Sequence, residues 1–299
     1  MANVALDIGG TLAKVCWVDS VSPADPLDFE CGTGTMHLCL FDTQDLDSLI
    51  AFIRPKLHGE ELPVTGGGAY KFCEKLEQSL GVHVKKVDEM QALHRGFKYV
   101  LKTVPQPAFT YRESEGAAPV TDLECPCLLV NCGTGVSILK IEEEKMQRVT
   151  GTCLGGGSLL GLASALLGVR SYEEIMHLCE VGNAANVDVL MSDIYGPEGG
   201  DTVAVSLGKI ALNETHFEKA DLARSLLNMF AYNVGNIAYL VTRLEKVSTI
   251  FFAGNFIRNH HYTMDRITFA VDYWSNQLVR PLFLKHDGFF GVIGAHLAS

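Results

Sequence analysis

The feature that most constrains the fold is a strand, a glycine turn and a second strand near the start of the chain. An apolar run at residues 4–8 leads into the turn, and an alternating strand resumes at residues 12–18. Glycines leave backbone N–H groups open to phosphate oxygens, and a carboxylate can hold Mg²⁺ through water. The pattern predicts a phosphate-binding hairpin, although Gly-Gly also suits an ordinary hairpin turn. The residues of this turn are Asp7, Gly9, Gly10 and Thr11.

A second strand–turn–strand unit repeats this pattern near the middle of the chain. Residues 127–131 and 136–141 are strand-like, and Gly133, Thr134 and Gly135 separate them. Two such units flanked by helical segments predict an α/β protein with mixed sheets and an internal duplication.

The length of 299 residues gives room for two lobes. We expect an N-terminal lobe at 1–125 and a C-terminal lobe at 126–299. Residues 103–126 hold four prolines and little periodicity, which predicts a surface excursion or a connector between the lobes. Apolar spacing and capping patterns predict helices at 44–57, 69–80, 88–102, 158–167, 219–246, 262–276 and 291–298. Further strands are expected at 36–41, 62–65, 147–150 and 249–253.

The charge balance excludes some classes of partner. With 24 basic and 35 acidic residues the net charge is −11, which argues against nucleic-acid binding and anionic membranes. No apolar run approaches the roughly 20 residues that span a bilayer. The first residues lack a secretory signal pattern, and the nine cysteines are scattered as in a reduced compartment. We therefore expect a cytoplasmic protein, and we interpret Cys125-Pro126-Cys127 as structural.

Eight sequence blocks in order give the chain its resemblance to a known family. The blocks are ALDIGGTLAKV, TGGGAYKF, VDEMQALHRG, LLVNCGTGVSIL, RVTGTCLGGGSLLGL, NVDVLMSDIYG, FFAGNFIR and DYWSNQ. Together they resemble the eukaryotic-type (type II) pantothenate kinases, of the actin, hexokinase and heat-shock-chaperone ATPase superfamily. The likeness covers residues 3–298, is poor at 103–126, and includes a shortened loop after Tyr195.

The resemblance implies two ribonuclease-H-like lobes with mixed β-sheets, an actin-like ATPase fold with the nucleotide in the interlobe cleft. It places a catalytic helix in the first lobe and dimerisation helices in the second. The implied activity is phosphorylation of pantothenate with ATP and Mg²⁺, the first step towards coenzyme A. A homodimer and inhibition by acetyl-CoA or another CoA thioester are also implied.

The resemblance implies a role for each site residue that matches a position of the family. Asp7 would hold Mg²⁺ through water, and Lys14 would be a phosphate cation, although an outward-facing strand lysine is the simpler interpretation. The second turn keeps its hydroxyl, because Thr134 stands where the family has Ser. The implied ATP and phosphate contacts are Asp7, Gly9, Gly10, Thr11, Lys14, Gly133, Thr134, Gly135, Gly156, Gly254 and Asn255.

Two residues carry the implied chemistry. Glu89 matches the carboxylate that orients the acceptor hydroxyl and takes its proton, although an acidic residue also suits a first helical turn. Arg148 matches the cation that stabilises the transition state, and a planar guanidinium suits two oxygens at once. Without the resemblance, a strand arginine would be a solvated surface charge.

Ser137, Arg148, Tyr195 and Trp274 match positions that contact pantothenate, the two aromatic residues from a neighbouring subunit. Two other functions stay open. One is a kinase for a different hydroxyl substrate, such as pantetheine or a sugar. The other is a catalytically silent regulatory subunit that binds nucleotide or acyl-CoA, for example within a hetero-oligomer with a paralogue.

Overall fold

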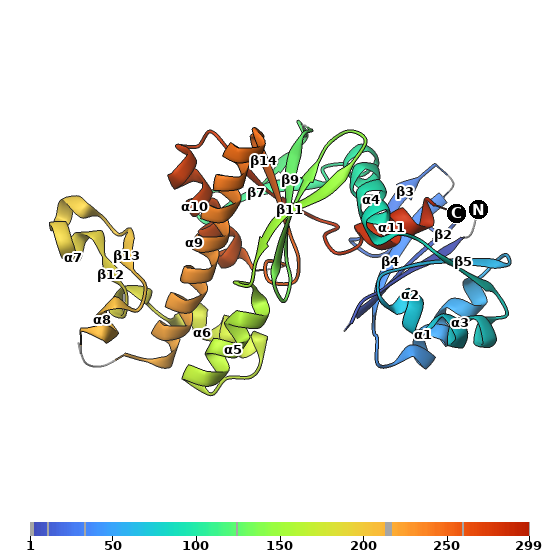
Figure 1. Cartoon of the computed structure of the whole chain (residues 1–299), viewed down its shortest axis with the longest axis horizontal. Helices are drawn as coiled ribbons and strands as arrows, with labels where there is room; N and C mark the ends of the chain where they lie inside the picture. The colour runs from blue at the N-terminus through green and yellow to red at the C-terminus, as the bar shows by residue number, and fades with distance from the viewer. Residues whose placement is uncertain are drawn as a thin grey trace.

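The protein is built from two mixed sheets whose strands follow the same order (Figure 1). The computed structural model describes residues 3–10, 12–32, 34–123, 125–212, 217–258 and 260–298. In each sheet an antiparallel three-strand meander is followed by two parallel strands, in the order 3-2-1-4-5. The predicted internal duplication is therefore present in the topology itself.

The first sheet has the order β3-β4-β2-β1-β5-β6. Its strands are β1 (Val4–Ile8), β2 (Leu12–Asp19), β3 (Phe29–Cys31), β4 (Gly34–Asp42), β5 (Glu61–Thr65) and β6 (His83–Lys86). The helices after the meander are α1 (Leu46–Ile53), the 3₁₀ turn η1 (Arg54–Lys56), α2 (Gly68–Lys71) and α3 (Cys73–Leu80). α1 and α3 bury leucine and isoleucine side chains against one face of this sheet.

The second sheet has the order β11-β10-β9-β14-β15-β7-β8. Its strands are β7 (Ala108–Arg112), β8 (Gly116–Val120), β9 (Cys127–Cys132), β10 (Val136–Ile141), β11 (Met146–Thr152), β14 (Thr249–Ala253) and β15 (Arg280–Leu284). The helices α5 (Gly156–Leu167), α6 (Tyr172–Val181), α9 (Lys219–Glu245) and α10 (His261–Ser275) pack in the core on one face.

Two helices lie between the sheets and share a single core with both of them (Figure 1). These are α4 (Glu89–Thr103) and α11 (Phe290–His296). They approach backbone to backbone: a Cβ on Gly96 would lie 1.9 Å from the carbonyl oxygen of Phe290, and one on Gly294 would lie 1.7 Å from that of Ala92. No other residue type fits at either position, so the crossing fixes the position of α4.

A small arm projects from the second lobe, on the side away from the first (Figure 1). It consists of η2 (Ala184–Asn186), β12 (Val189–Leu190), α7 (Met191–Tyr195), η3 (Pro197–Gly199), β13 (Val203–Val205) and α8 (Gly208–Ala211). Among the described residues, no helix combines the length and apolarity needed to cross a bilayer.

Residues 103–126, expected to form a surface excursion or a connector between the lobes, contain a regular hairpin. The segment contains β7 and β8, which extend the second sheet by pairing β7 with β15. Pro119 lies in β8, the last strand of its sheet, where a missing N–H costs no ladder hydrogen bond. The domain boundary at 125/126 stays a prediction. The two sheets do not divide at this position. β7 and β8 precede it but belong to the second sheet, and α11 follows it but contacts β1 and β5 of the first sheet.

Candidate active site

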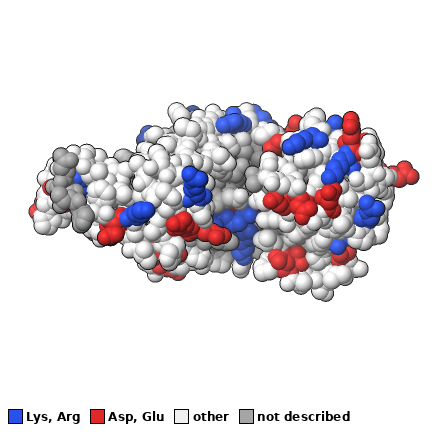
Figure 2. All heavy atoms as spheres, turned by 90° about the horizontal axis from the view of Figure 1, so that it is seen from below, with Lys and Arg blue, Asp and Glu red and all other residues white. Residues whose placement is uncertain are grey.

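A cavity of about 330 Å³ lies between the lobes, where both hairpin turns meet the N-terminus of α4, the turn after β14 and the start of α11. Lys14 and Arg258 are the basic residues of its lining, and Figure 2 shows Lys and Arg side chains in the hollow between the two halves. Thr11 lies outside the described residues. The predicted residues in the lining are Asp7, Gly9, Gly10, Lys14, Glu89, Gly133, Gly254 and Asn255.

Asp7 is held in one orientation by its neighbours. The register of β1 and β2 places it opposite Lys14, whose Nζ lies 3.3 Å from Oδ2. A Cβ on Gly66 would lie 2.8 Å from Oδ1, and one on Gly291 would lie 2.8 Å from Oδ2. A side chain at either glycine would therefore collide with the carboxylate of Asp7.

The donor set at Asp7 fits a water-mediated magnesium ion. Among the described residues, no group of three His, Cys, Asp or Glu side chains could hold a metal. A single carboxylate that lines a phosphate-sized cavity is the usual arrangement for Mg²⁺, which keeps several waters and takes few protein ligands. The sequence had indicated the same mode of binding.

Glu89 is the first residue of α4. Asp88 caps this helix by accepting a hydrogen bond of 2.9 Å from the N–H of Gln91, which confirms the predicted cap. Glu89 is exposed and lines the cavity. Because α4 is fixed by its crossing with α11, the carboxylate of Glu89 starts from a rigid helix and not from a mobile loop.

The second turn is held by helix α5. The N–H of Gly156 donates to the carbonyl of Gly133, and that of Gly157 donates to the carbonyl of Thr134, each at 2.9 Å. Gly156 was expected to contact ATP or phosphate, and that contact stays a prediction; its N–H has an acceptor within the protein. Gly156 therefore supports the turn. Thr134 and Gly135 are exposed but lie outside the cavity lining.

Arg148 and Ser137 both lie near Gly151 of β11. The register of β10 and β11 places Ser137 opposite Gly151. A Cβ on Gly151 would lie 2.9 Å from Nη2 of Arg148 and 3.6 Å from Cα of Ser137. The guanidinium therefore occupies the space that a side chain would need, which pairs two of the predicted substrate contacts.

Glu89 and Arg148 were expected to converge on the transferred phosphoryl group. In this structure α4 and β11 are in contact, but only Glu89 lines the cavity. Arg148 is exposed on β11. Glu89 and Arg148 thus lie on two elements that are in contact, but they do not line the same cavity.

An ion pair that sequence reasoning missed supports the turn after β14. Asp287 accepts 2.7 Å and 2.6 Å hydrogen bonds from Nε of Arg258 and the N–H of Gly254. Its side chain is 7% exposed, and Arg258 lines the cavity. The sequence signal that could have indicated this ion pair is Arg258, four residues after Gly254. Its partner Asp287 is distant in sequence.

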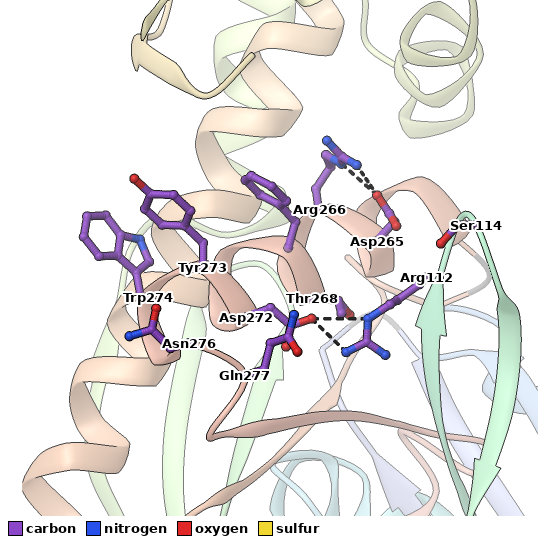
Figure 3. A pocket seen from close by; sticks show the side chains of 11 residues that line it. Arg112, Ser114, Asp265, Arg266, Thr268, Asp272, Tyr273, Trp274, Asn276 and Gln277 are labelled. Atoms are coloured by element: carbon purple, nitrogen blue, oxygen red, sulfur yellow. Dashed lines mark hydrogen bonds and ion pairs between the residues drawn. The ribbon is translucent and has the colours of Figure 1, made fainter. Parts of the chain in front are cut away.

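Tyr195 and Trp274 lie away from this cavity. Tyr195 is 67% exposed on the arm, and Trp274 is 49% exposed on α10. Figure 3 shows Trp274 beside Tyr273 at the edge of a hollow between α10 and β7, where Arg112 donates to Asp272 at 2.8 Å. Neither aromatic side chain completes the interlobe cavity within this chain.

Known proteins resemble this chain over nearly its whole length. The Fumble family matches residues 3–298. The chain is 36% identical to pantothenate kinase 1 of Arabidopsis thaliana, covering 99% of this chain and 85% of that protein. It is 35% identical to the pantothenate kinase of Schizosaccharomyces pombe, covering 99% and 82%. It is also 35% identical to a Mus musculus protein named 4′-phosphopantetheine phosphatase, covering 98% of this chain but 40% of that one.

Solved structures share the fold at low sequence identity. A ROK hexokinase from Thermus thermophilus matches with a TM-score of 0.52 at 13% identity, covering 99% of this chain and 98% of that one. A ROK family glucokinase from Streptomyces griseus, in complex with glucose and AMPPNP, matches with a TM-score of 0.53 at 13% identity, covering 100% and 99%. These neighbours confirm the expected actin-like ATPase fold.

Proposed function

The chain belongs to the Fumble family, and on that premise we propose that it transfers the γ-phosphoryl group of ATP to the primary hydroxyl of pantothenate. The products are 4′-phosphopantothenate and ADP. One observation carries this proposal: a single interlobe cavity gathers Asp7, Lys14 and Glu89 with the glycines of both turns. The pantothenate kinases that the chain resembles span nearly all of it, which supports the same substrate.

Phosphate binding falls to the two turns. Gly9, Gly10 and Gly133 line the cavity. The N–H groups of Gly9 and Gly133 donate to the carbonyls of Leu12 and Gly135 and hold the two turns, so a phosphate oxygen would approach the N–H of Gly10. Lys14 would leave its 3.3 Å contact with Asp7 and turn to a phosphate. Asp7 would hold Mg²⁺ through water, and the ion when bound neutralises charge on the phosphate oxygens. Gly254 and Asn255 would face the adenosine.

The chemical step needs an oriented acceptor and a neutralised phosphoryl group. Glu89 would accept the hydrogen bond, and then the proton, of the pantothenate hydroxyl. Arg148 would stabilise the charge of the transition state, with Ser137 beside it holding pantothenate. Closure of the lobes on both substrates would bring β11 over the cavity, since α4 and β11 already touch.

The test is purified protein with ATP, Mg²⁺ and pantothenate, followed by mass spectrometric detection of phosphopantothenate. Glu89→Gln is expected to lower kcat by about 10²- to 10⁴-fold, because it removes the proton acceptor. Asp88→Asn is the matched control: it removes a charge one residue away, while Asn caps a helix as well as Asp does. Undiminished product from Glu89→Gln, or an equal loss from Asp88→Asn, would remove Glu89 from its role.

The same assay decides the alternatives. Binding of ATP or acyl-CoA by calorimetry, without turnover of any hydroxyl substrate, would make the chain a silent regulatory subunit. Turnover of pantetheine or a sugar in preference to pantothenate would change the substrate. Testing these alternatives matters because the mouse relative is named for a phosphatase. A match over the chain therefore does not by itself fix the activity.

We propose a homodimer in which Tyr195 and Trp274 complete the site of the neighbouring subunit. Their exposure, on the arm and on α10, supports a role outside their own chain. Mixing Glu89→Gln with Trp274→Ala tests this, because a mixed dimer would contain one intact site. Recovered activity supports the shared site; no recovery in a proven mixed dimer overturns it. A stable complex only with a paralogue would indicate a hetero-oligomer.

Inhibition by acetyl-CoA or another CoA thioester belongs to the same proposal, as does a cytoplasmic location. A CoA thioester is expected to compete with ATP or pantothenate at the interlobe cavity. Steady-state inhibition patterns with acetyl-CoA test the first expectation, and fractionation of cells that produce the protein tests the second.

A further inference from the structure

Behind the catalytic helix α4 lies a second cavity, which the proposed reaction does not use. Its volume is about 1000 Å³, and it is bounded by α4, the turn between β10 and β11, and the end of the segment that follows β8. Lys98, Cys125 and Glu143 are among its lining residues. It therefore lies where the elements that carry Glu89 and Arg148 meet.

Two cysteines lie close together at the edge of this cavity. The Sγ atoms of Cys125 and Cys127 are 4.0 Å apart. Cys125 is exposed, whereas Cys127 is fully buried at the start of β9. A hydroperoxide can therefore reach the first thiol from the solvent, and it can reach the second only through the first. This is the arrangement of a peroxide-reactive cysteine and its resolving partner.

The surroundings of Cys125 favour its thiolate. The thiol of Cys127 donates to Cys125 and holds the pKa of Cys125 at about 7, with Lys98 adding a positive charge against the opposing effects of burial and Glu143. Lys98 in turn pairs with Glu143 at 2.7 Å, and His94 on the same helix donates to the carbonyl of Glu142. The pair thus lies beside the contacts that join α4 to the turn before β11.

We propose that Cys125 and Cys127 form a reversible redox site, in which a hydroperoxide oxidises Cys125 and Cys127 resolves it to a disulfide. In the first step the Cys125 thiolate attacks the terminal oxygen of the hydroperoxide: an S–O bond forms, the O–O bond breaks, and hydroxide leaves from hydrogen peroxide or an alkoxide from an organic hydroperoxide. In the second step Sγ of Cys127 attacks Sγ of Cys125: the S–S bond forms, the S–O bond breaks, and water leaves with the thiol proton. A dithiol reductant reverses the change.

The reaction removes the negative charge of the thiolate beside Lys98. It thereby changes the charges at the junction between α4 and the β10–β11 turn. The interpretation of Cys125-Pro126-Cys127 as purely structural does not account for the exposure of one thiol next to a buried one.

The test uses the intact chain and needs no kinase activity, so it can fail independently of the proposed function. Protein treated with a slight excess of hydrogen peroxide is alkylated, digested and examined by mass spectrometry. The peptide that contains both cysteines is expected to lose about 2 Da, for two hydrogens, and to regain them with dithiothreitol. Iodoacetamide is expected to alkylate Cys125 about threefold faster at pH 7 than a small thiol of pKa about 8.5, since its larger thiolate fraction outweighs its lower nucleophilicity.

Matched variants keep the test decisive. Cys125→Ser changes an exposed residue and is expected to abolish the disulfide and leave Cys127 unmodified. Cys153→Ser changes the other exposed cysteine of the described residues and is expected to leave the disulfide intact. The proposal is overturned if peroxide leaves both thiols alkylatable, if Cys125 proceeds to sulfinic acid with Cys127 untouched, or if Cys127 is oxidised in Cys125→Ser.

Discussion

The two hairpins of this protein share one backbone design and carry different chemistry. In the first, β1 and β2 place Asp7 opposite Lys14. In the second, β9 and β10 place Asn131 opposite Ser137 at the equivalent positions. A carboxylate and an ammonium in one lobe thus correspond to an amide and a hydroxyl in the other. At these two positions the charged pair lies in the hairpin that would handle metal and phosphate, and the neutral pair lies in the hairpin that would face a hydroxylated substrate.

The two turns are also held by different means. In the first lobe, glycines at residues 66 and 291 confine the side chain of Asp7. In the second lobe, backbone N–H groups of Gly156 and Gly157 donate to the turn itself. The comparison teaches that a duplicated scaffold can fix a charged side chain in one copy and a backbone path in the other. Substitutions that exchange these features should reveal which of them the activity requires.

Making the first hairpin like the second should have the largest effect. Asp7→Asn is expected to lower kcat/KM by about 10- to 100-fold and to raise the Mg²⁺ concentration needed for half-maximal rate, since the amide has no charge to hold hydrated Mg²⁺. The converse change, Asn131→Asp, is the control, and it should not restore activity when combined with Asp7→Asn. Kinetics with varied Mg²⁺ measure both. An unchanged Mg²⁺ requirement in Asp7→Asn would contradict the division of labour between the hairpins.

Crowding the confined carboxylate should have the next largest effect. Gly291→Ala places a methyl group 2.8 Å from Oδ2 of Asp7, and overpacking of this kind costs about 1–3 kcal/mol of unfolding free energy. Gly161→Ala is the matched control, because it lies in α5 with open space around it and should gain about 0.5–1 kcal/mol. Urea unfolding and turnover are measured for both. Equal behaviour of the two variants would show that Asp7 is not confined.

Removing the hydroxyl of the second hairpin should have a smaller and more selective effect. Ser137→Ala is expected to raise KM for pantothenate by about 2- to 10-fold, the loss of one hydrogen bond, and to leave KM for ATP unchanged. Steady-state kinetics with each substrate varied in turn check this. A change confined to KM for ATP would move Ser137 from the substrate to the nucleotide side of the site.

The smallest effect concerns the extra strand β3, which the repeated five-strand pattern of the first lobe does not include. Burial opposes ionisation of Asp28, but hydrogen bonds from Ala24, Asp25 and His37 outweigh it and lower its pKa. A lowered folded-state pKa gives stability that is present above the unfolded pKa and is lost as pH falls through the folded value. Asp28→Asn should cost about 1 kcal/mol near pH 6 and weaken the acid dependence below about pH 4. Melting temperatures from pH 3 to pH 6 measure this, and an unchanged slope would contradict it.

Local signals in the sequence predicted much of this architecture. Alternating strands around Gly turns, the Asp88 cap and the apolar spacing of 219–246 each determine an element through neighbours in the chain, and each element is present. The hairpin at 108–120 was missed because the prolines in and around it broke the strand pattern. Pro119, the one inside it, lies in the edge strand β8, where a proline is tolerated.

The site was less predictable, because its details depend on residues far apart in the chain. The ion pair of Arg258 with Asp287 spans 29 positions. The confinement of Asp7 by Gly291 and the crossing of Gly96 with Gly294 join opposite ends of the sequence. The use of the Gly156 N–H by the second turn likewise depends on where α5 begins. None of these contacts can be predicted from the spacing of residues in the sequence.

The crossing of α4 and α11 has a consequence for how the protein is made. During translation, residues 89–103 leave the ribosome long before residues 290–296, so the glycine face of α4 has no partner until α11 has emerged. Nascent chains should therefore leave the glycine face of α4 uncovered until that point. Glu89 should acquire its fixed position only once α11 packs on α4, so the complete cavity is expected to form late in the order of synthesis.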